Sequence, residues 1–189
     1  MWENLLILLY KFTQKNIIIT LQLSHVILSA IHSKCSDILQ ARQILLGNLI
    51  EEEQGEENHP ELWKRFAKGL GCLRNQRTSE PKLDSTQKLV QGVIKLTEES
   101  FSIGLGVLYA YERQTPKVSD SKIQGLQKFY GNSDYRTLQS FIVHSKVDQW
   151  HTQECANLIN NLSSKEQTLA YQGAKLLWQF LEGINATYQ

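Results

Sequence analysis

The sequence has few of the residues that break helices or cross-link a chain. It contains only 3 prolines, 3 cysteines and 1 methionine among 189 residues. The cysteines, Cys35, Cys72 and Cys155, are odd in number and widely spaced, which excludes a disulfide framework and a Cys-x2-Cys zinc site. A reducing, cytoplasmic compartment is therefore the simplest prediction. The scarcity of proline also favours long helices.

No charge of one sign dominates the chain. Lys and Arg number 20 and Asp and Glu number 19, which gives a formal net charge of +1. A nucleic-acid-binding protein usually carries a clustered basic excess, so we predict no nucleic-acid partner. Hydrophobic residues make up 41% and charged residues 21%, the ordinary balance of a soluble globular protein. The length predicts a single domain over residues 1–189.

No apolar run is long enough to span a membrane. Residues 5–10 read LLILLY, and the apolar stretch 17–31 is interrupted by Gln22, Ser24 and His25. A spanning helix needs about 20 mostly apolar residues. A secretory signal has basic residues before its apolar run, whereas this chain has an acidic one there. We therefore predict a buried first helix and no membrane partner.

Helical periodicity is the feature that the sequence has in abundance. Apolar residues recur at helical spacing over residues 37–53, 58–69, 89–113, 119–131, 134–159 and 163–184. Asn58 is expected to cap the second of these helices, with Pro60 in its first turn and Glu61 at the capping-box position. No segment shows strand alternation or hairpin chemistry. The pattern predicts an all-α domain of six or seven helices arranged as a bundle.

The histidines carry the clearest chemical signal. Residues 144–151 read HSKVDQWH, which places His144, Asp148 and His151 on one face of a helix. Two imidazoles and a carboxylate that point inward suit iron, manganese or zinc. The same spacing is also found on ordinary solvated helix faces, and the triplet alone does not decide between the two.

Further carboxylates strengthen the metal hypothesis. Glu112 lies late in the most apolar helix and is either a surface residue or a ligand, because a buried unpaired charge is costly. Glu52 and His59 flank a glycine and could approach one centre from both sides of a kink, although spacing alone leaves Glu51 and Glu53 as alternatives. Three carboxylates and three histidines from three helical segments match the set of ligands that helical bundles use for two-metal sites. They do not match a structural zinc site.

Four segments of the chain resemble one known family. They are ILSAIHSKC (27–35), NLIEEEQGEENHPELW (48–63), LGVLYAYERQTPKVSDSKIQGLQKFYG (105–131) and FIVHSKVDQWHTQE (141–154). The motifs YExQxP, K-I-x-G-L-x-x-F/Y-G and H-x3-D-x2-H are each weak alone and specific in combination. On these motifs the chain is similar to the family of the Chlamydia protein associating with death domains (CADD), which are heme-oxygenase-like di-metal oxidases. PQQ-synthesis protein C and the TenA thiaminases are more distantly similar.

The resemblance implies a seven-helix, heme-oxygenase-like bundle that holds two metal ions, Fe/Fe or Fe/Mn. The matching ligand positions are Glu52, His59, Glu112, His144, Asp148 and His151. The implied activity is oxygen-dependent synthesis of para-aminobenzoate for folate, with O2 as co-substrate and an external reductant. Family members consume one of their own tyrosines and use a lysine as amino-group donor, which corresponds to Lys122. Composition alone would make Lys122 a solvated lysine at the start of a helix.

The N-terminus departs from the family pattern. The family has a further helix before the matched region, and that helix carries the consumed tyrosine. Its position falls before Met1, and a second family tyrosine aligns near Thr13, where the resemblance has faded. We therefore expect an N-terminal helix that is shortened or replaced, and an impaired activity. The apolar surface left uncovered would favour association, for example as a homodimer.

Two other functions compete with the oxidase. The name of the family records binding to host death-domain proteins, so the chain could be a helical interaction module that is secreted into a host. A binding module would tolerate loss of the six ligands, whereas the enzyme needs all of them, and their joint presence favours the enzyme. A TenA-like thiaminase would instead need a cysteine nucleophile beside an acid and no metal ligands.

Overall fold

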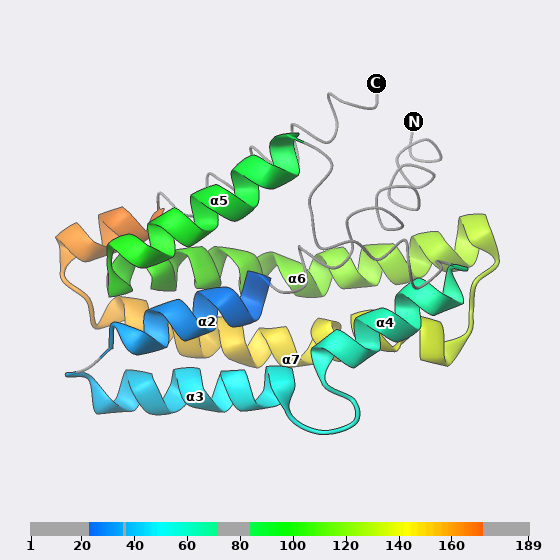
Figure 1. Cartoon of the computed structure of the whole chain (residues 1–189), viewed down its shortest axis with the longest axis horizontal. Helices are drawn as coiled ribbons and strands as arrows, with labels where there is room; N and C mark the ends of the chain where they lie inside the picture. The colour runs from blue at the N-terminus through cyan, green and yellow to red at the C-terminus, as the bar shows by residue number, and fades with distance from the viewer. Residues whose placement is uncertain (1–22, 36, 72–83, 172–189) are drawn as a thin grey trace.

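The periodic segments of the sequence form helices, which a computed structural model describes over residues 23–35, 37–71 and 84–171 (Figure 1). The helices are α2 (Leu23–Ser33), α3 (Leu39–Glu53), α4 (His59–Gly69), α5 (Asp84–Glu99), α6 (Phe101–Tyr130) and α7 (Tyr135–Asn160). Residues 164–171 are helical as well. Within these ranges every regular element is a helix, so the all-α prediction is confirmed.

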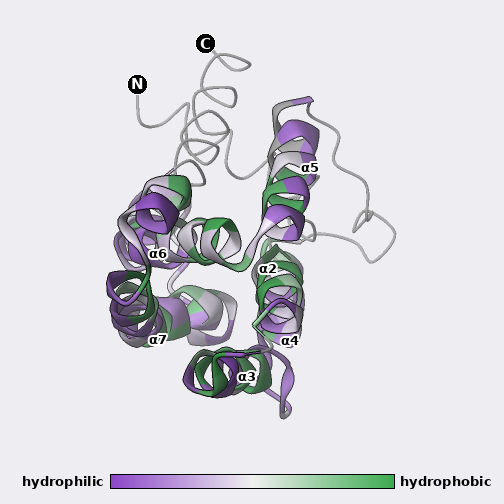
Figure 2. Cartoon of the chain, turned by 90° about the vertical axis from the view of Figure 1, so that its left-hand side faces the viewer, coloured by the Kyte–Doolittle hydropathy of each residue, from purple (hydrophilic) through white to green (hydrophobic). Residues whose placement is uncertain are grey.

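The two longest helices form the centre of the bundle. α6 and α7 run side by side, α3 and α4 pack against α7, and α2 and α5 pack against α6 (Figure 1). Figure 2, turned by 90°, shows α6 and α7 stacked on one side and α2 and α4 on the other. Any side chain on the facing surfaces of α6 and α7 is therefore enclosed by other helices.

Among the described residues, the apolar core forms two clusters, one toward each end of the α6–α7 pair. The first cluster joins α2, α3, the start of α6 and the end of α7, and includes Ile27, Leu45, Leu105 and Cys155. The second joins α4, the end of α6 and the start of α7, and includes Phe66, Leu126, Leu138 and Phe141. Between the two clusters, the middle of both long helices carries buried polar residues. That polar band contains the candidate site.

Helix caps fix the ends of the elements that flank the band. The Asn58 side chain accepts a hydrogen bond from the backbone N–H of Glu61 at 2.9 Å, which confirms the predicted cap of α4. Asp134 caps α7 in the same way through the backbone N–H of Thr137. α6 ends at Gly131, whose φ of 60° is the left-handed conformation that favours glycine.

The structure divides the long apolar segment differently from the prediction. Residues 89–113 were expected to form one helix, but α5 ends at Glu99 and a new helix begins after Ser100. Ser100 has extended backbone angles, and its hydroxyl accepts from the backbone N–H of Ile103 at 3.2 Å. A serine in this role starts a helix without interrupting the apolar pattern, which is why periodicity alone missed the boundary.

The predicted break between residues 113 and 119 is wrong, because α6 continues through Pro116. Proline removes one backbone hydrogen bond from a helix. The two residues before it donate side-chain hydrogen bonds one turn back, Gln114 to the carbonyl of Ala110 and Thr115 to that of Tyr111, both at 2.9 Å. Packing along α7 supports the same continuous helix.

Several predictions lie outside the described residues. They concern the N-terminal segment with Thr13, the cysteine at position 72 and the chain after residue 171. Within the described ranges, no helix combines the length and the apolar character needed to cross a membrane.

Candidate metal centre

α7 presents three ionisable side chains to the interior of the bundle. His144, Asp148 and His151 are 6%, 1% and 1% exposed. The Nδ1 atom of His144 lies 3.3 Å from Oδ1 of Asp148, one helical turn away. Their burial excludes the solvated-face alternative, and their spacing puts all three on the same side of α7.

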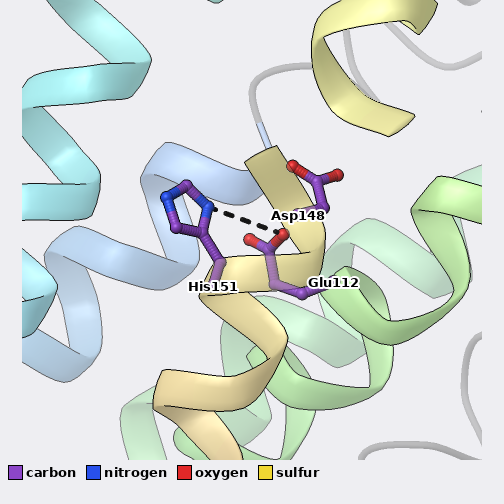
Figure 3. A group of neighbouring side chains, drawn as sticks. All are labelled: Glu112, Asp148 and His151. Carbon is purple, nitrogen blue, oxygen red and sulfur yellow. Dashed lines mark ion pairs between the residues drawn. The ribbon is translucent and has the colours of Figure 1, made fainter. Parts of the chain in front are cut away.

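Glu112 faces this row from α6. It is 2% exposed, so the surface alternative for this carboxylate is also excluded. Its Oε2 atom lies 3.9 Å from Nδ1 of His151. Figure 3 shows the Glu112 carboxylate directed at the His151 ring, with the Asp148 side chain beyond it in this view. One donor atom from each of the three residues lies within 4.8 Å of the others, close enough to bind one ion together.

Glu52 and His59 complete the group from the other side of the bundle. They stand at the end of α3 and the start of α4, on either side of the turn 54–58. Oε2 of Glu52 lies 2.8 Å from Nδ1 of His59 and accepts a hydrogen bond from the Ser24 hydroxyl at 3.1 Å. The His59 ring centre is 4.3 Å from that of His144. The two residues therefore lie together in the interior, one from each side of the turn, and His59 contacts the row on α7.

All six sequence-predicted residues form one continuous buried cluster. Successive contacts connect Glu52, His59, His144, Asp148, Glu112 and His151. Sequence reasoning missed Ser24 altogether and left Glu51 undecided. The Oε2 atom of Glu51 lies 2.9 Å from Nε2 of His151.

The pKa shifts in the cluster indicate that its carboxylates would be stabilised by a bound cation. Burial raises the pKa of Glu112 well above its usual range, and the charges of Asp148 and Glu52 raise it further. Burial also opposes ionisation of Glu52, but hydrogen bonding and the positive charges of His59 and His144 lower its pKa overall. The pKa of His59 is raised because its pairing with Glu52 outweighs burial. Three carboxylates enclosed together repel one another, and a bound metal ion would relieve that repulsion.

An unpartnered atom in the cluster fits a metal. Nδ1 of His151 is buried and has no hydrogen-bond partner, and its contact with Oε2 of Glu112 is 3.9 Å long. Buried polar atoms are nearly always hydrogen-bonded, so this nitrogen beside buried carboxylates indicates that another ligand belongs there. Imidazole nitrogen and carboxylate oxygen together are donors that suit iron and manganese. The residues present therefore fit the metal that the sequence implied.

Two further side chains approach the cluster from α6. Burial raises the pKa of the Tyr111 phenol well above its usual range, and the charge of Glu112 adds to the effect. The Nζ atom of Lys122 lies 5.2 Å from the ring centre of Phe141, and burial lowers its pKa to about 8. Phe141 packs on Trp63, whose ring centre is 6.2 Å from that of His144. Lys122 is thus a half-buried residue inside a long helix with its amine over an aromatic ring, not a solvated lysine at a helix start.

Comparisons with known proteins agree with this site. A family model described as iron-containing redox enzyme matches residues 16–182. The 4-aminobenzoate synthase of Nitrosomonas europaea is 37% identical over 157 residues, which cover 79% of this chain and 64% of the relative. The 4-aminobenzoate synthase of Chlamydia muridarum is 36% identical over 83% of this chain and 66% of its own length. That of Chlamydia pneumoniae is 36% identical over 85% of this chain and 74% of its own.

These matches confirm the resemblance drawn from four segments of the sequence. The chain spans just under two thirds of the length of the first two relatives. The matched family region covers α2 to α7 together with the helical residues 164–171. The chain therefore belongs to the family of iron-containing redox enzymes that have the heme-oxygenase-like helical bundle.

Proposed function

We propose that the protein is an oxygen-dependent di-metal oxidase of the CADD type that produces para-aminobenzoate, with the impaired activity expected from the sequence. The observation that carries the proposal is the continuous buried cluster of three carboxylates and three imidazoles in a member of an iron-containing redox family. The product is proposed from the relatives named 4-aminobenzoate synthase. A helical interaction module, the alternative function, gives no reason to enclose these six groups.

The ligands of the two metal ions, in this proposal, are Glu52, His59, Glu112, His144, Asp148 and His151. Iron in both positions, or iron with manganese, suits this mixture of nitrogen and oxygen donors. When bound, the metals would supply the activation and reduction of O2, with electrons from an external reductant. The protein supplies ligands on rigid helices and an interior from which water is largely excluded.

Lys122 is the proposed amino-group donor. An amine acts as a nucleophile only when it is unprotonated, and a pKa of about 8 leaves a useful neutral fraction near neutral pH. The Phe141 ring beneath the amine holds it in an apolar setting on the side of the cluster that contains His144. Desolvation is thus the physical cause of the reactivity that the proposed role requires.

Anaerobic loading with Fe(II), alone or with Mn(II), tests the proposal. Elemental analysis by mass spectrometry should find about two metal ions per chain, and exposure to O2 and a reductant should yield para-aminobenzoate detectable by chromatography and mass spectrometry. His144→Ala should lose both the metal and the product while remaining folded by circular dichroism. A folded wild-type protein that stays metal-free after loading would overturn the proposed centre. A protein that binds two metal ions and makes no para-aminobenzoate would overturn the proposed product.

A further inference from the structure

We propose that Glu51 is a positioning residue for His151, and that it selects the imidazole tautomer whose Nδ1 atom faces the metal centre. The inference rests on the proposed metal centre, which it deepens by assigning a role to a residue outside the six ligands. It makes Nδ1, and not Nε2, the metal-binding atom of His151.

The two nitrogen atoms of His151 have different surroundings. Nε2 lies 2.9 Å from Oε2 of Glu51, within hydrogen-bond distance. Nδ1 lies 3.9 Å from Oε2 of Glu112 and has no hydrogen-bond partner, although it is buried. One nitrogen is thus satisfied by a carboxylate at the edge of the site, and the other points into the cluster.

Elementary hydrogen-bond chemistry assigns the proton. An ionised carboxylate only accepts hydrogen bonds, so Nε2 of His151 must carry the hydrogen that Glu51 receives. In a neutral imidazole this leaves the lone pair on Nδ1, which is the form that binds a metal ion. Outer carboxylates of this kind also hold the ring in place and raise its basicity as a ligand.

The exposure of the pair suits a positioning role. The side chain of His151 is 1% exposed, whereas that of Glu51 is 57% exposed. Glu51 therefore retains most of its hydration, while its carboxylate reaches the edge of a buried ring. The contact with Glu51 at 2.9 Å is the shorter of the two carboxylate contacts of the ring, which suits it to fix the orientation of the imidazole.

The last turn of α3 explains why only one of three adjacent glutamates takes this role. Successive residues of a helix point in directions about 100° apart. Glu52 is 4% exposed and enters the cluster, Glu51 reaches His151 from the edge, and Glu53 is exposed to solvent. One turn thereby supplies a proposed metal ligand in Glu52, a hydrogen-bond partner for His151 in Glu51, and a matched control position in Glu53.

The tautomer can be measured without any metal. Long-range proton–nitrogen NMR spectra of metal-free protein labelled with 15N-histidine, with His151 assigned from a His151→Gln sample, should show the Nε2–H form. Glu51→Gln should keep it, because an amide oxygen also accepts, and Glu53→Ala should match the wild type. Glu51→Ala should move the ring toward a mixture of tautomers. A wild-type Nδ1–H form, or an unchanged tautomer in Glu51→Ala, would overturn the assignment.

Iron binding supplies the second readout. In anaerobic competition with a chelator, Glu51→Ala should bind Fe(II) about 10–100-fold more weakly than the wild type. Glu51→Gln should lose less than about tenfold, and Glu53→Ala should lose nothing. Equal affinity of Glu51→Ala and wild type would refute the positioning role. A wild type that binds no iron would instead refute the proposed centre, and the tautomer spectra would still test the Glu51–His151 pair.

Discussion

At the scale of single residues, the buried amine of Lys122 lowers the stability of the folded protein, and the same burial supports its proposed role as amino-group donor. Burial lowers the pKa of its amine from 10.5 to about 8, so the folded state binds fewer protons than the unfolded state between these values. The free energy of unfolding should therefore rise as pH increases from about 8 to about 10.5. Below about pH 8 the full penalty of burying the charged amine is present.

Replacing the amine by an apolar side chain should remove that penalty. We expect Lys122→Met to be more stable than the wild type by on the order of 1–3 kcal/mol at pH 7, with a flatter dependence on pH above 8. Urea denaturation at pH 7, 8 and 9.5 measures both effects. The variant should keep its iron and lose para-aminobenzoate synthesis.

Lys128→Met is the matched control, because Lys128 lies over the ring of Phe129 on the same helix but is exposed. It should change neither the pH dependence nor the product. If Lys122→Met made as much para-aminobenzoate as the wild type, Lys122 would not be the amino-group donor. If the pH dependence of its urea denaturation were unchanged, the wild-type amine would be hydrated in the folded protein.

Individual residues also mark the limit of what the sequence could predict about the site. His144, Asp148 and His151 were predictable because a single helix fixes their relative directions. The role of Glu51 was not, since choosing among three consecutive glutamates requires the rotation of α3 against α7. The role of Ser24 could not be predicted for a similar reason. Its hydrogen bond to Glu52 joins two helices, and a single serine in an apolar helix belongs to no sequence motif.

At the scale of elements, a polar clamp holds the turn between α3 and α4 against α7. Arg65 donates from Nη1 to Glu57 at 3.0 Å and to Gln139 at 3.1 Å, and from Nη2 to the carbonyl of Glu56 at 2.9 Å. Gln139 returns a hydrogen bond to Glu57 at 2.9 Å. Because Glu52 and His59 flank this turn, the clamp sets the separation of two proposed ligands.

Breaking the clamp should weaken iron binding without touching a ligand. We expect Arg65→Met to lose about 1–3 kcal/mol of stability, because hydrogen bonds to charged groups are lost, and to bind Fe(II) several-fold more weakly. Hydrogen exchange at the backbone of residues 54–58 should become faster. Lys64→Met, which removes an exposed ion pair with Glu61 on the same helix, should leave both properties unchanged. Slow exchange in Arg65→Met would show that the turn is held by other contacts.

Gly106 allows α6 and the helical residues 164–171 to approach each other closely. A Cβ atom at Gly106 would lie 2.3 Å from the backbone Cα of Ala170, which cannot move away as a side chain tip would. Gly106→Ala should therefore destabilise the protein by about 1–3 kcal/mol in urea denaturation. Gly47 lies inside α3 with nothing within 4 Å of such a Cβ, so Gly47→Ala should stabilise by about 0.5–1 kcal/mol. Equal effects of the two substitutions would contradict the contact.

The elements also show where periodicity succeeds and fails. α7 was predicted to within a residue because Asp134 caps it and its apolar pattern has no breaker. The region of α5 and α6 was misjudged in both directions, since Ser100 ends one helix inside an unbroken pattern and Pro116 does not end the next. The first outcome depends on a side-chain hydrogen bond to the backbone and the second on packing along α7, and a hydrophobic pattern contains neither.

At the scale of the whole molecule, the bundle places a charged layer between two apolar clusters. The clusters pack the ends of the α6–α7 pair, and the enclosed carboxylates lie between them. Without a metal, this layer opposes folding through the burial of the Glu112 carboxylate beside Asp148 and Glu52. With a metal bound, the same layer should support the native state, because a ligand that binds only the folded protein adds to its stability.

Glu112 is the residue at which this balance can be measured. Burial and the charges of Asp148 and Glu52 all disfavour its ionised form, so Glu112→Gln should stabilise the metal-free protein by about 1–3 kcal/mol. The same variant should gain little stability when Fe(II) is added anaerobically, whereas the wild type should gain about 2.7 kcal/mol at a free iron concentration 100 times its Kd. Urea denaturation with and without iron measures both, and Glu98→Gln, on the exposed surface of α5, should behave as the wild type. Iron that stabilises Glu112→Gln as much as the wild type would show that this carboxylate is not part of the centre.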